Sequence, residues 1–237
     1  MAVKMTDPRY PRICISITAG TTQEALIKME AGFAQTDMLE LRIDGLRRVD
    51  LKRLLADKKG EILVTNRVKK EGGAFTGNEE ARVDLLKEAV ALGADYVDLE
   101  LGTDRDLIAD LKKKIEAHQG KTKLILSYHN QEGTPPREAL QKILEEGCRA
   151  GADIIKIVPW AVEVGDNLTV LDLIPYAKRL GTEIITFCMG EKGKISRAIA
   201  PLLGSYLTYA ALTKGEESAP GQMTVQELKQ IFALIKF

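Results

Sequence analysis

The chain has 237 residues, of which 45% are hydrophobic and 29% are charged, and its 34 basic side chains are matched by 34 acidic ones. This length can bury a full core, and the balanced charge argues against a surface for nucleic acid or for an anionic membrane. No apolar run approaches the ~20 residues of a membrane-spanning helix, and residues 1–12 lack the apolar segment of a signal peptide, so we expect no membrane partner.

Strand-like and helix-like patterns alternate along the whole chain. The expected strands are short runs of apolar, often β-branched residues at 13–17, 38–42, 62–67, 96–101, 123–129, 153–158, 183–189 and 206–210. Each is followed by a segment with helical periodicity, at 21–33, 50–58, 79–92, 104–118, 136–150, 168–180, 195–202 and 224–236. Thr21 or Thr22 is a suitable N-cap for the first helix. Eight such units in this length predict an α/β fold, a closed (β/α)₈ TIM barrel, as a single domain over residues 1–237.

A doubly wound open sheet is the alternative architecture. Such a sheet usually has fewer strands, and it often carries a phosphate-binding loop. The segment 190–196 looks superficially like such a loop, but its spacing is too short for a Walker motif. We therefore favour the barrel.

Lys156 stands in the middle of the sixth expected strand, between Ile155 and Ile157. Side chains alternate between the two faces of a strand, so Lys156 points away from the face that these two isoleucines share. A lysine is rare in an apolar interior unless it is paired with an anion or takes part in catalysis. An edge strand with Lys156 in water is the simpler alternative.

The same alternation can be applied to the other strands of a barrel, where active sites lie at the carboxyl ends of the strands. If the leucine, isoleucine and valine partners face the helices, polar side chains from five strands point inward: Ser16, Glu40, Arg42, Thr65, Arg67, Ser127, His129 and Lys156. Surface charges placed at random would not all fall on the inward face. This convergence predicts an active site and disfavours the edge-strand alternative.

The chemistry expected of Lys156 is imine formation with a ketone or an aldehyde. A free lysine has a pKa of ~10.4, and low dielectric together with neighbouring cations, by hypothesis Arg42 and Arg67, would disfavour its charged form. A protonated imine is an electron sink that acidifies the adjacent carbon, so a proton carrier is needed. His129 is the candidate, whereas His118 ends a lysine-rich helix and is expected to be solvated.

The cysteines Cys14, Cys148 and Cys188 are odd in number and far apart, which predicts reduced thiols in a cytoplasmic protein. With two histidines and no Cys-x-x-Cys pair, we expect no metal site.

Seven short segments, spread over nearly the whole chain, resemble one family. They are Ile-Ser-Ile at 15–17, Leu-Glu-Leu-Arg-Ile-Asp at 39–44, Asn-Arg-Val-Lys-Lys-Glu-Gly-Gly at 66–73, Ser-Tyr-His-Asn at 127–130, Ala-Asp-Ile-Ile-Lys at 152–156, Lys-Ile-Ser-Arg at 194–197 and Ser-Ala-Pro-Gly-Gln at 218–222. In these segments the chain is similar to the type I 3-dehydroquinate dehydratases of the shikimate pathway, which serves aromatic amino acid biosynthesis. The resemblance implies a cofactor-free hydro-lyase that converts 3-dehydroquinate to 3-dehydroshikimate, and it implies a homodimer.

The resemblance also implies roles for individual residues. Lys156 would form the imine, His129 would move the proton from the adjacent carbon to the departing hydroxyl, and Glu71 would orient His129. The implied substrate-binding residues are Ser16, Glu40, Arg42 and Arg67 near the ring hydroxyls, Met189 against the ring, and Arg197, Ser218 and Gln222 on the carboxylate. Where relatives often carry a second methionine, this chain has Phe187.

Some assignments stay open at this point. Asp98 and Glu100 share one face of the fourth strand and are candidate inward counter-ions, to which the resemblance assigns no role. The polar segment 214–221 is a candidate lid over the substrate. The competing functions are another imine-forming barrel enzyme, such as a class I aldolase or transaldolase, and a non-catalytic barrel that binds a small carboxylate.

Overall fold

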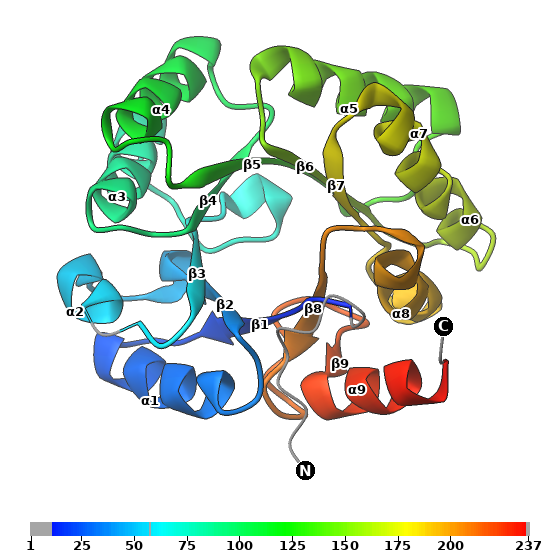
Figure 1. The fold of residues 1–237 in the computed structure, drawn as a ribbon, viewed down its shortest axis with the longest axis horizontal. Coiled ribbons are helices and arrows are strands. Elements are labelled where there is room, and N and C mark those ends of the chain that lie inside the picture. The colour runs from blue at the N-terminus through cyan, green and yellow to red at the C-terminus, as the bar shows by residue number, and fades with distance from the viewer. Residues whose placement is uncertain (1–10, 57, 236–237) are drawn as a thin grey trace.

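The computed structural model describes residues 11–56 and 58–235. Its strands form one parallel sheet in the order β7-β6-β5-β4-β3-β2-β1-β8-β9, curled into a barrel with the helices outside (Figure 1). The strands are β1 (Ile13–Thr18), β2 (Met38–Arg42), β3 (Glu61–Thr65), β4 (Tyr96–Glu100), β5 (Lys123–Asn130), β6 (Ile154–Pro159), β7 (Glu183–Thr186), β8 (Thr208–Ala211) and β9 (Met223–Thr224). The Tyr206 N–H donates to the Ile184 carbonyl at 2.7 Å and joins the start of β8 to β7. The (β/α)₈ barrel is confirmed, and the open sheet is wrong.

The α-helices follow the strands in alternation. They are α1 (Thr22–Phe33), α2 (Leu51–Leu55), α3 (Glu79–Ala91), α4 (Arg105–Ala117), α5 (Arg137–Ala150), α6 (Asp166–Leu171), α7 (Leu173–Leu180), α8 (Lys194–Leu203) and α9 (Val225–Leu234). Short 3₁₀ turns that the sequence did not indicate lie at η1 (Ile43–Gly45), η2 (Lys69–Glu71) and η3 (Glu191–Gly193). Thr21 caps α1, where its side chain accepts from the Glu24 N–H. Thr224 and Glu227 form a capping box on α9.

The largest departure from the expected helices is the break between α6 and α7 at Asp172, within the stretch 168–180 that was expected to be one helix. Pro175 has no N–H to give to the Leu171 carbonyl, so it is tolerated in the first turn of a new helix and disfavoured inside a continuous one. The helix expected over 50–58 ends at Leu55, and its residue 57 lies outside the described residues. The last helix ends at Leu234, and position 236 also lies outside them.

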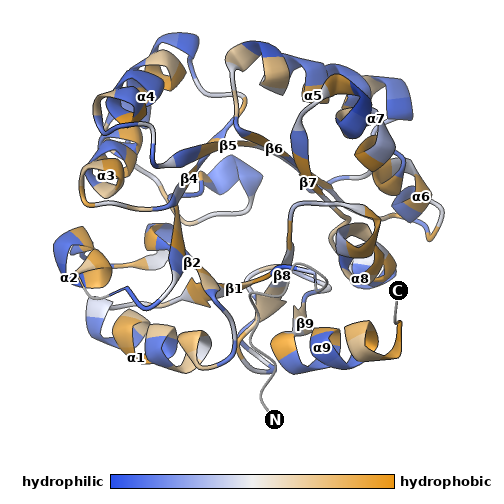
Figure 2. Cartoon of the chain, viewed as in Figure 1, coloured by the Kyte–Doolittle hydropathy of each residue, from blue (hydrophilic) through white to orange (hydrophobic). Residues whose placement is uncertain are grey.

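Two apolar layers separate the outside of the barrel from its inside. Outward side chains of the strands, among them Leu39, Leu41 and Ile62, pack with residues of the helices. A second cluster lies inside the barrel and includes Met38 and Leu63. Figure 2 shows mostly hydrophobic strands and helices that carry both kinds of residue. Along β2 the inward residues therefore change from Met38 to the polar Glu40, so the polar positions lie toward the carboxyl ends of the strands, as the alternation predicted.

Candidate active site

A pocket opens at the carboxyl ends of the strands, and its walls come from distant parts of the chain. The catalytic and substrate-binding residues that the resemblance implied all line it: Ser16, Glu40, Arg42, Arg67, Glu71, His129, Lys156, Met189, Arg197, Ser218 and Gln222. Thr65 and Ser127, which were also expected to point inward, are buried and do not line it. The lining also includes Trp160 and Tyr209, which the sequence analysis did not single out, and Phe187. The register of the parallel strands explains part of this, because it sets Ser16 beside Glu40 and Ser127 beside Lys156.

Lys156 lies on β6 and is only 5% exposed. Its strand pairs with β5 on one side and with β7 on the other, so the edge-strand alternative is wrong. The Nζ atom lies 3.1 Å from Asp98 Oδ2 and 3.8 Å from Glu40 Oε1. It also donates to the Tyr209 hydroxyl at 3.2 Å and lies 4.4 Å from the centre of that ring. Two carboxylates and a phenol thus hold the amine.

The two arginines that were expected to act on Lys156 are occupied elsewhere. Arg42 donates from Nε and Nη2 to the two carboxylate oxygens of Asp44, each at 2.8 Å. Arg67 pairs with Asp98 and with Glu100, also at 2.8 Å. The charged groups that contact Lys156 are therefore carboxylates, and the expected activation by free neighbouring cations has no support in these contacts.

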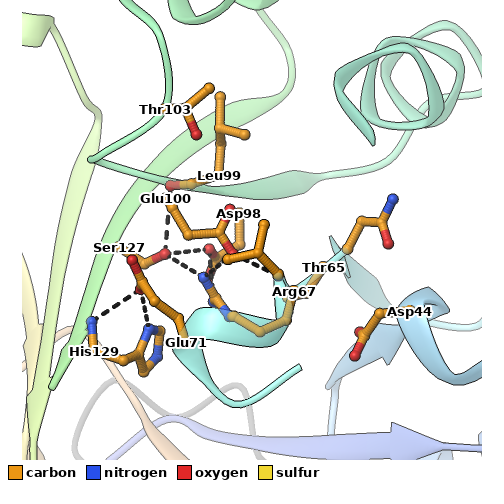
Figure 3. Close-up of polar contacts among 12 residues, drawn as sticks. Asp44, Thr65, Arg67, Glu71, Asp98, Leu99, Glu100, Thr103, Ser127 and His129 are labelled. Carbon is orange, nitrogen blue, oxygen red and sulfur yellow. Dashed lines mark hydrogen bonds and ion pairs between the residues drawn. The ribbon is translucent and has the colours of Figure 1, made fainter. Parts of the chain in front are cut away.

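Asp98 and Glu100 are inward counter-ions in a row of alternating charges that begins at Lys156. Figure 3 shows Arg67 between these two carboxylates, with Ser127 donating to Asp98 Oδ1 at 2.6 Å. The row continues from Glu100 to Arg82, which is fully buried. Burial tends to raise the pKa of the Asp98 carboxyl, but the charges of Arg67 and Lys156 prevail and hold it well below its usual range. Asp98 therefore stays charged beside the lysine.

His129 and Glu71 form the second functional pair. Glu71 Oε2 lies 3.0 Å from His129 Nδ1 and accepts the His129 backbone N–H at 3.0 Å (Figure 3). Glu71 reaches β5 because η2 is followed by Gly72, whose φ of +83° favours glycine, and by Gly73, where a Cβ would meet the Arg67 carbonyl. The loop thus turns back over the end of the barrel.

The surroundings keep the imidazole neutral. Burial lowers the pKa of His129 well below 6.5, and the nearby charges of Arg67 and Lys156 lower it further. Burial raises the pKa of Glu71 to about 7, although Arg67 opposes this shift. With Nδ1–H donated to the Glu71 carboxylate, the neutral ring has its lone pair on Nε2, so Nε2 is the basic nitrogen.

Arg197 is a buried cation on α8 that has no acidic partner among the described residues. It is 1% exposed, and its Nη2 atom donates a hydrogen bond to the Pro220 carbonyl at 3.3 Å. Its Nε atom is buried without a hydrogen-bond partner in the part of the chain that the structure describes, and its guanidinium carbon lies 4.5 Å from the centre of the Phe187 ring. Burial lowers the pKa of Arg197 to about 10. Nearby, Gln222 Oε1 accepts from the Ser218 N–H at 2.8 Å. This corner of the pocket suits an incoming anion.

Neither a metal cluster nor a membrane span is found in the described part of the chain. No group of three or more histidine, cysteine, aspartate or glutamate side chains there could hold a metal ion. No helix in residues 11–56 and 58–235 has the length and apolar character needed to cross a membrane.

Comparisons with known proteins identify what this chain is similar to. Residues 13–236 match the type I 3-dehydroquinase family. A 3-dehydroquinate dehydratase from Desulfotalea psychrophila is 36% identical over 94% of this chain and 97% of its own length. The crystal structure of 3-dehydroquinate dehydratase from Geobacillus kaustophilus has a TM-score of 0.87 at 30% identity, covering 95% of this chain and 91% of its own. A type I 3-dehydroquinate dehydratase from Clostridium difficile, solved with covalently modified comenic acid, has a TM-score of 0.86 at 28% identity and covers 95% and 92%.

Proposed function

Because the chain belongs to the type I 3-dehydroquinase family, its reaction is the dehydration of 3-dehydroquinate to 3-dehydroshikimate, and we propose that Lys156, His129 and Glu71 carry it out through a protonated imine. This reaction is a step of the shikimate pathway, which leads to the aromatic amino acids. The match over residues 13–236 favours dehydration over the carbon–carbon cleavage of an aldolase-like barrel.

Lys156 is the nucleophile in this proposal, because it is the one lysine among the described residues that line the pocket. The amine adds to the substrate ketone, water leaves, and the nitrogen keeps one hydrogen and a positive charge. The charged nitrogen withdraws electrons from the neighbouring carbon and acidifies its hydrogen. Asp98 lies 3.1 Å from the nitrogen before the reaction, so it can balance this charge throughout.

His129 is the base that removes the carbon-bound hydrogen. Its neutral form and the bond from Nδ1 to Glu71 leave Nε2 free to accept a proton. The electron pair of the broken carbon–hydrogen bond moves toward the imine nitrogen. It returns when the hydroxyl departs, and the departing hydroxyl takes the proton from His129. Hydrolysis of the product imine then frees Lys156.

The substrate carboxylate is assigned to Arg197, and the observation that carries this assignment is the burial of Arg197 with no acidic partner in residues 11–56 and 58–235. A carboxylate can accept two hydrogen bonds from the guanidinium fork. Ser218 and Gln222 lie on the segment next to Arg197 and would add further donors. Glu40, Arg42, Arg67 and Ser16 would contact the ring hydroxyls, and Met189 the ring itself. Segment 214–221 would act as the lid.

Trapping with borohydride tests the central step. Reduction in the presence of 3-dehydroquinate should add mass to wild-type protein and leave Lys156→Ala unlabelled and inactive. Near wild-type turnover of Lys156→Ala would refute the imine mechanism. A binding module without catalysis would gain no adduct in either protein.

We further propose that the protein is a homodimer, that it lies in the cytoplasm and that it has no nucleic-acid partner. Cys14, Cys148 and Cys188 are free thiols, which supports a reducing compartment. Exposed apolar side chains at Val162, Val164 and Leu168, between 56% and 72% exposed, support a contact between copies. Light scattering of the purified protein would measure its mass, and a monomer at micromolar concentration would contradict the dimer.

A further inference from the structure

Among the described residues, three oxygen-bearing side chains lie within 4 Å of the Lys156 nitrogen, and one of the three is a hydroxyl. Two are the carboxylates of Asp98 and Glu40, at 3.1 Å and 3.8 Å. The third is the phenol oxygen of Tyr209, which accepts an N–H at 3.2 Å. Tyr209 lies on β8 and is 4% exposed, and its ring packs edge-on against Phe187 with 6.0 Å between the ring centres. The hydroxyl is therefore held beside the reacting atom by a fixed ring.

Imine formation moves two protons over a short path. An ammonium and a ketone together become a protonated imine and water, so two of the three hydrogens on the nitrogen end on the former carbonyl oxygen. The carbon–oxygen bonds break with their electron pairs on oxygen, and the nitrogen forms two bonds to carbon and keeps one hydrogen. The oxygen stays attached to the attacked carbon until the water leaves, so it lies beside Nζ while both protons move.

The three groups differ in their capacity to pass a proton on. A carboxylate that takes a proton must first become an acid, and Asp98 is held charged by Arg67 and Lys156. Glu40 already accepts from Ser16 at 2.6 Å and from Thr65 at 2.8 Å. A hydroxyl can accept a proton on its oxygen while it donates its own hydrogen, and it ends unchanged.

From this geometry we propose that Tyr209 is a catalytic residue whose hydroxyl relays protons from the Lys156 nitrogen to the ketone oxygen during imine formation. The inference rests on the proposed role of Lys156 and adds a second acid–base group to that of His129. Tyr209 takes a proton from the nitrogen and gives its own to the oxygen, first to form the carbinolamine and then to release water. No phenolate accumulates, which agrees with the burial that raises the pKa of Tyr209 well above 10.

With this relay, His129 and Tyr209 act on different atoms. His129 acts on the carbon-bound hydrogen, and Tyr209 acts on the nitrogen and the carbonyl oxygen. Imine formation therefore does not need His129, and the two steps can be separated by mutation. The His129→Ala protein isolates the first step, because it should form the imine and go no further.

Tyr209→Phe is the test, since it removes one oxygen atom and keeps the ring against Lys156 and Phe187. We would introduce it into His129→Ala and measure the rate of adduct formation with 3-dehydroquinate by rapid mixing, borohydride quench and intact mass. Acid–base catalysis is typically worth ~10²–10⁴ in rate, and water can replace part of it, so we expect adduct formation to slow by about 10- to 100-fold. The matched control is Tyr206→Phe, whose hydroxyl bonds to Tyr96 at 2.7 Å in the opposite end of the barrel.

The outcomes separate the relay from simpler roles. Binding of the substrate analogue in which the ketone is reduced to an alcohol should be unchanged in Tyr209→Phe, because that analogue cannot form an imine. Weaker binding of the analogue would point to a packing role and overturn the relay. An unchanged rate of adduct formation in Tyr209→Phe would also overturn it. If the parent His129→Ala protein formed no adduct while wild type did, imine formation would need His129, and the separate roles of His129 and Tyr209 would be refuted. If wild type formed no adduct on Lys156, the proposed function itself would fail.

Discussion

Replacing Arg197 by methionine should stabilise the fold and strongly weaken substrate binding. Methionine keeps an unbranched apolar stem and removes a buried cation that has no acidic partner among the described residues. The fall in the pKa of Arg197 from its usual value to about 10 corresponds to about 3 kcal/mol at ~1.4 kcal/mol for each pKa unit. Both values lie well above 7, so the guanidinium is charged in the folded and unfolded states at neutral pH and the whole penalty is present there. Loss of the hydrogen bond to Pro220 costs about 1 kcal/mol, which leaves a net gain of about 2 kcal/mol.

Thermal unfolding would measure this gain. For a chain of this size 1 kcal/mol shifts Tm by about 2–4 °C, so we expect a rise of about 4–8 °C. The reduced-ketone analogue should raise the Tm of wild type and leave that of Arg197→Met unchanged. Arg82→Met is the matched control, because Arg82 is equally buried but paired with Glu100, and removing one partner of a buried pair typically costs about 3–5 kcal/mol. If both variants lost stability, Arg197 would have an anion in the free protein and the reasoning would be wrong.

The remaining predictions concern the catalytic pair, the carboxylate site and metals. His129→Ala should lose turnover and still yield a borohydride-reducible adduct, and an active His129→Ala with an inactive Glu71→Gln would instead make Glu71 the base. As pH falls through about 7, Glu71 should take up a proton, and its carboxyl group should then donate a hydrogen bond to Nδ1 of His129. The neutral ring then carries its hydrogen on Nε2, which can no longer accept a proton from the substrate, so kcat/KM falls. This acid limb should be missing from the pH profile of Glu71→Gln, and its persistence at the same pH would assign it to His129. Arg197→Ala should lower kcat/KM by about 10- to 100-fold or more and Arg197→Lys by less, because a charge-assisted pair contributes roughly 1.5–3 kcal/mol; a lysine variant equal to wild type would place the carboxylate elsewhere. Prolonged treatment with a chelator should leave the rate unchanged, and a loss that zinc restores would reveal a metal requirement.

The alternation of side chains along single strands determined most of the site. That period of two is a local property, so Glu40, Arg42, His129 and Lys156 could be placed on the inner face before any strand was paired. The sequence analysis assigned no inward positions on the eighth strand. Tyr209 follows the inward Leu207 by two residues, so the same rule places Tyr209 inside the barrel. Helix starts were equally local, as at Thr21, because a cap involves neighbours three residues apart.

Partners of long side chains were decided only by the tertiary structure. Glu71 meets His129 across 58 positions, and Lys156 meets Asp98 across another 58, because the barrel brings the ends of different strands together. Arg42 illustrates the reverse case, since it pairs with Asp44 two residues away instead of acting on Lys156. The sequence alone determined which face each residue occupies, whereas contact between charges depends on how the strands are offset around the barrel, and no local pattern encodes that offset.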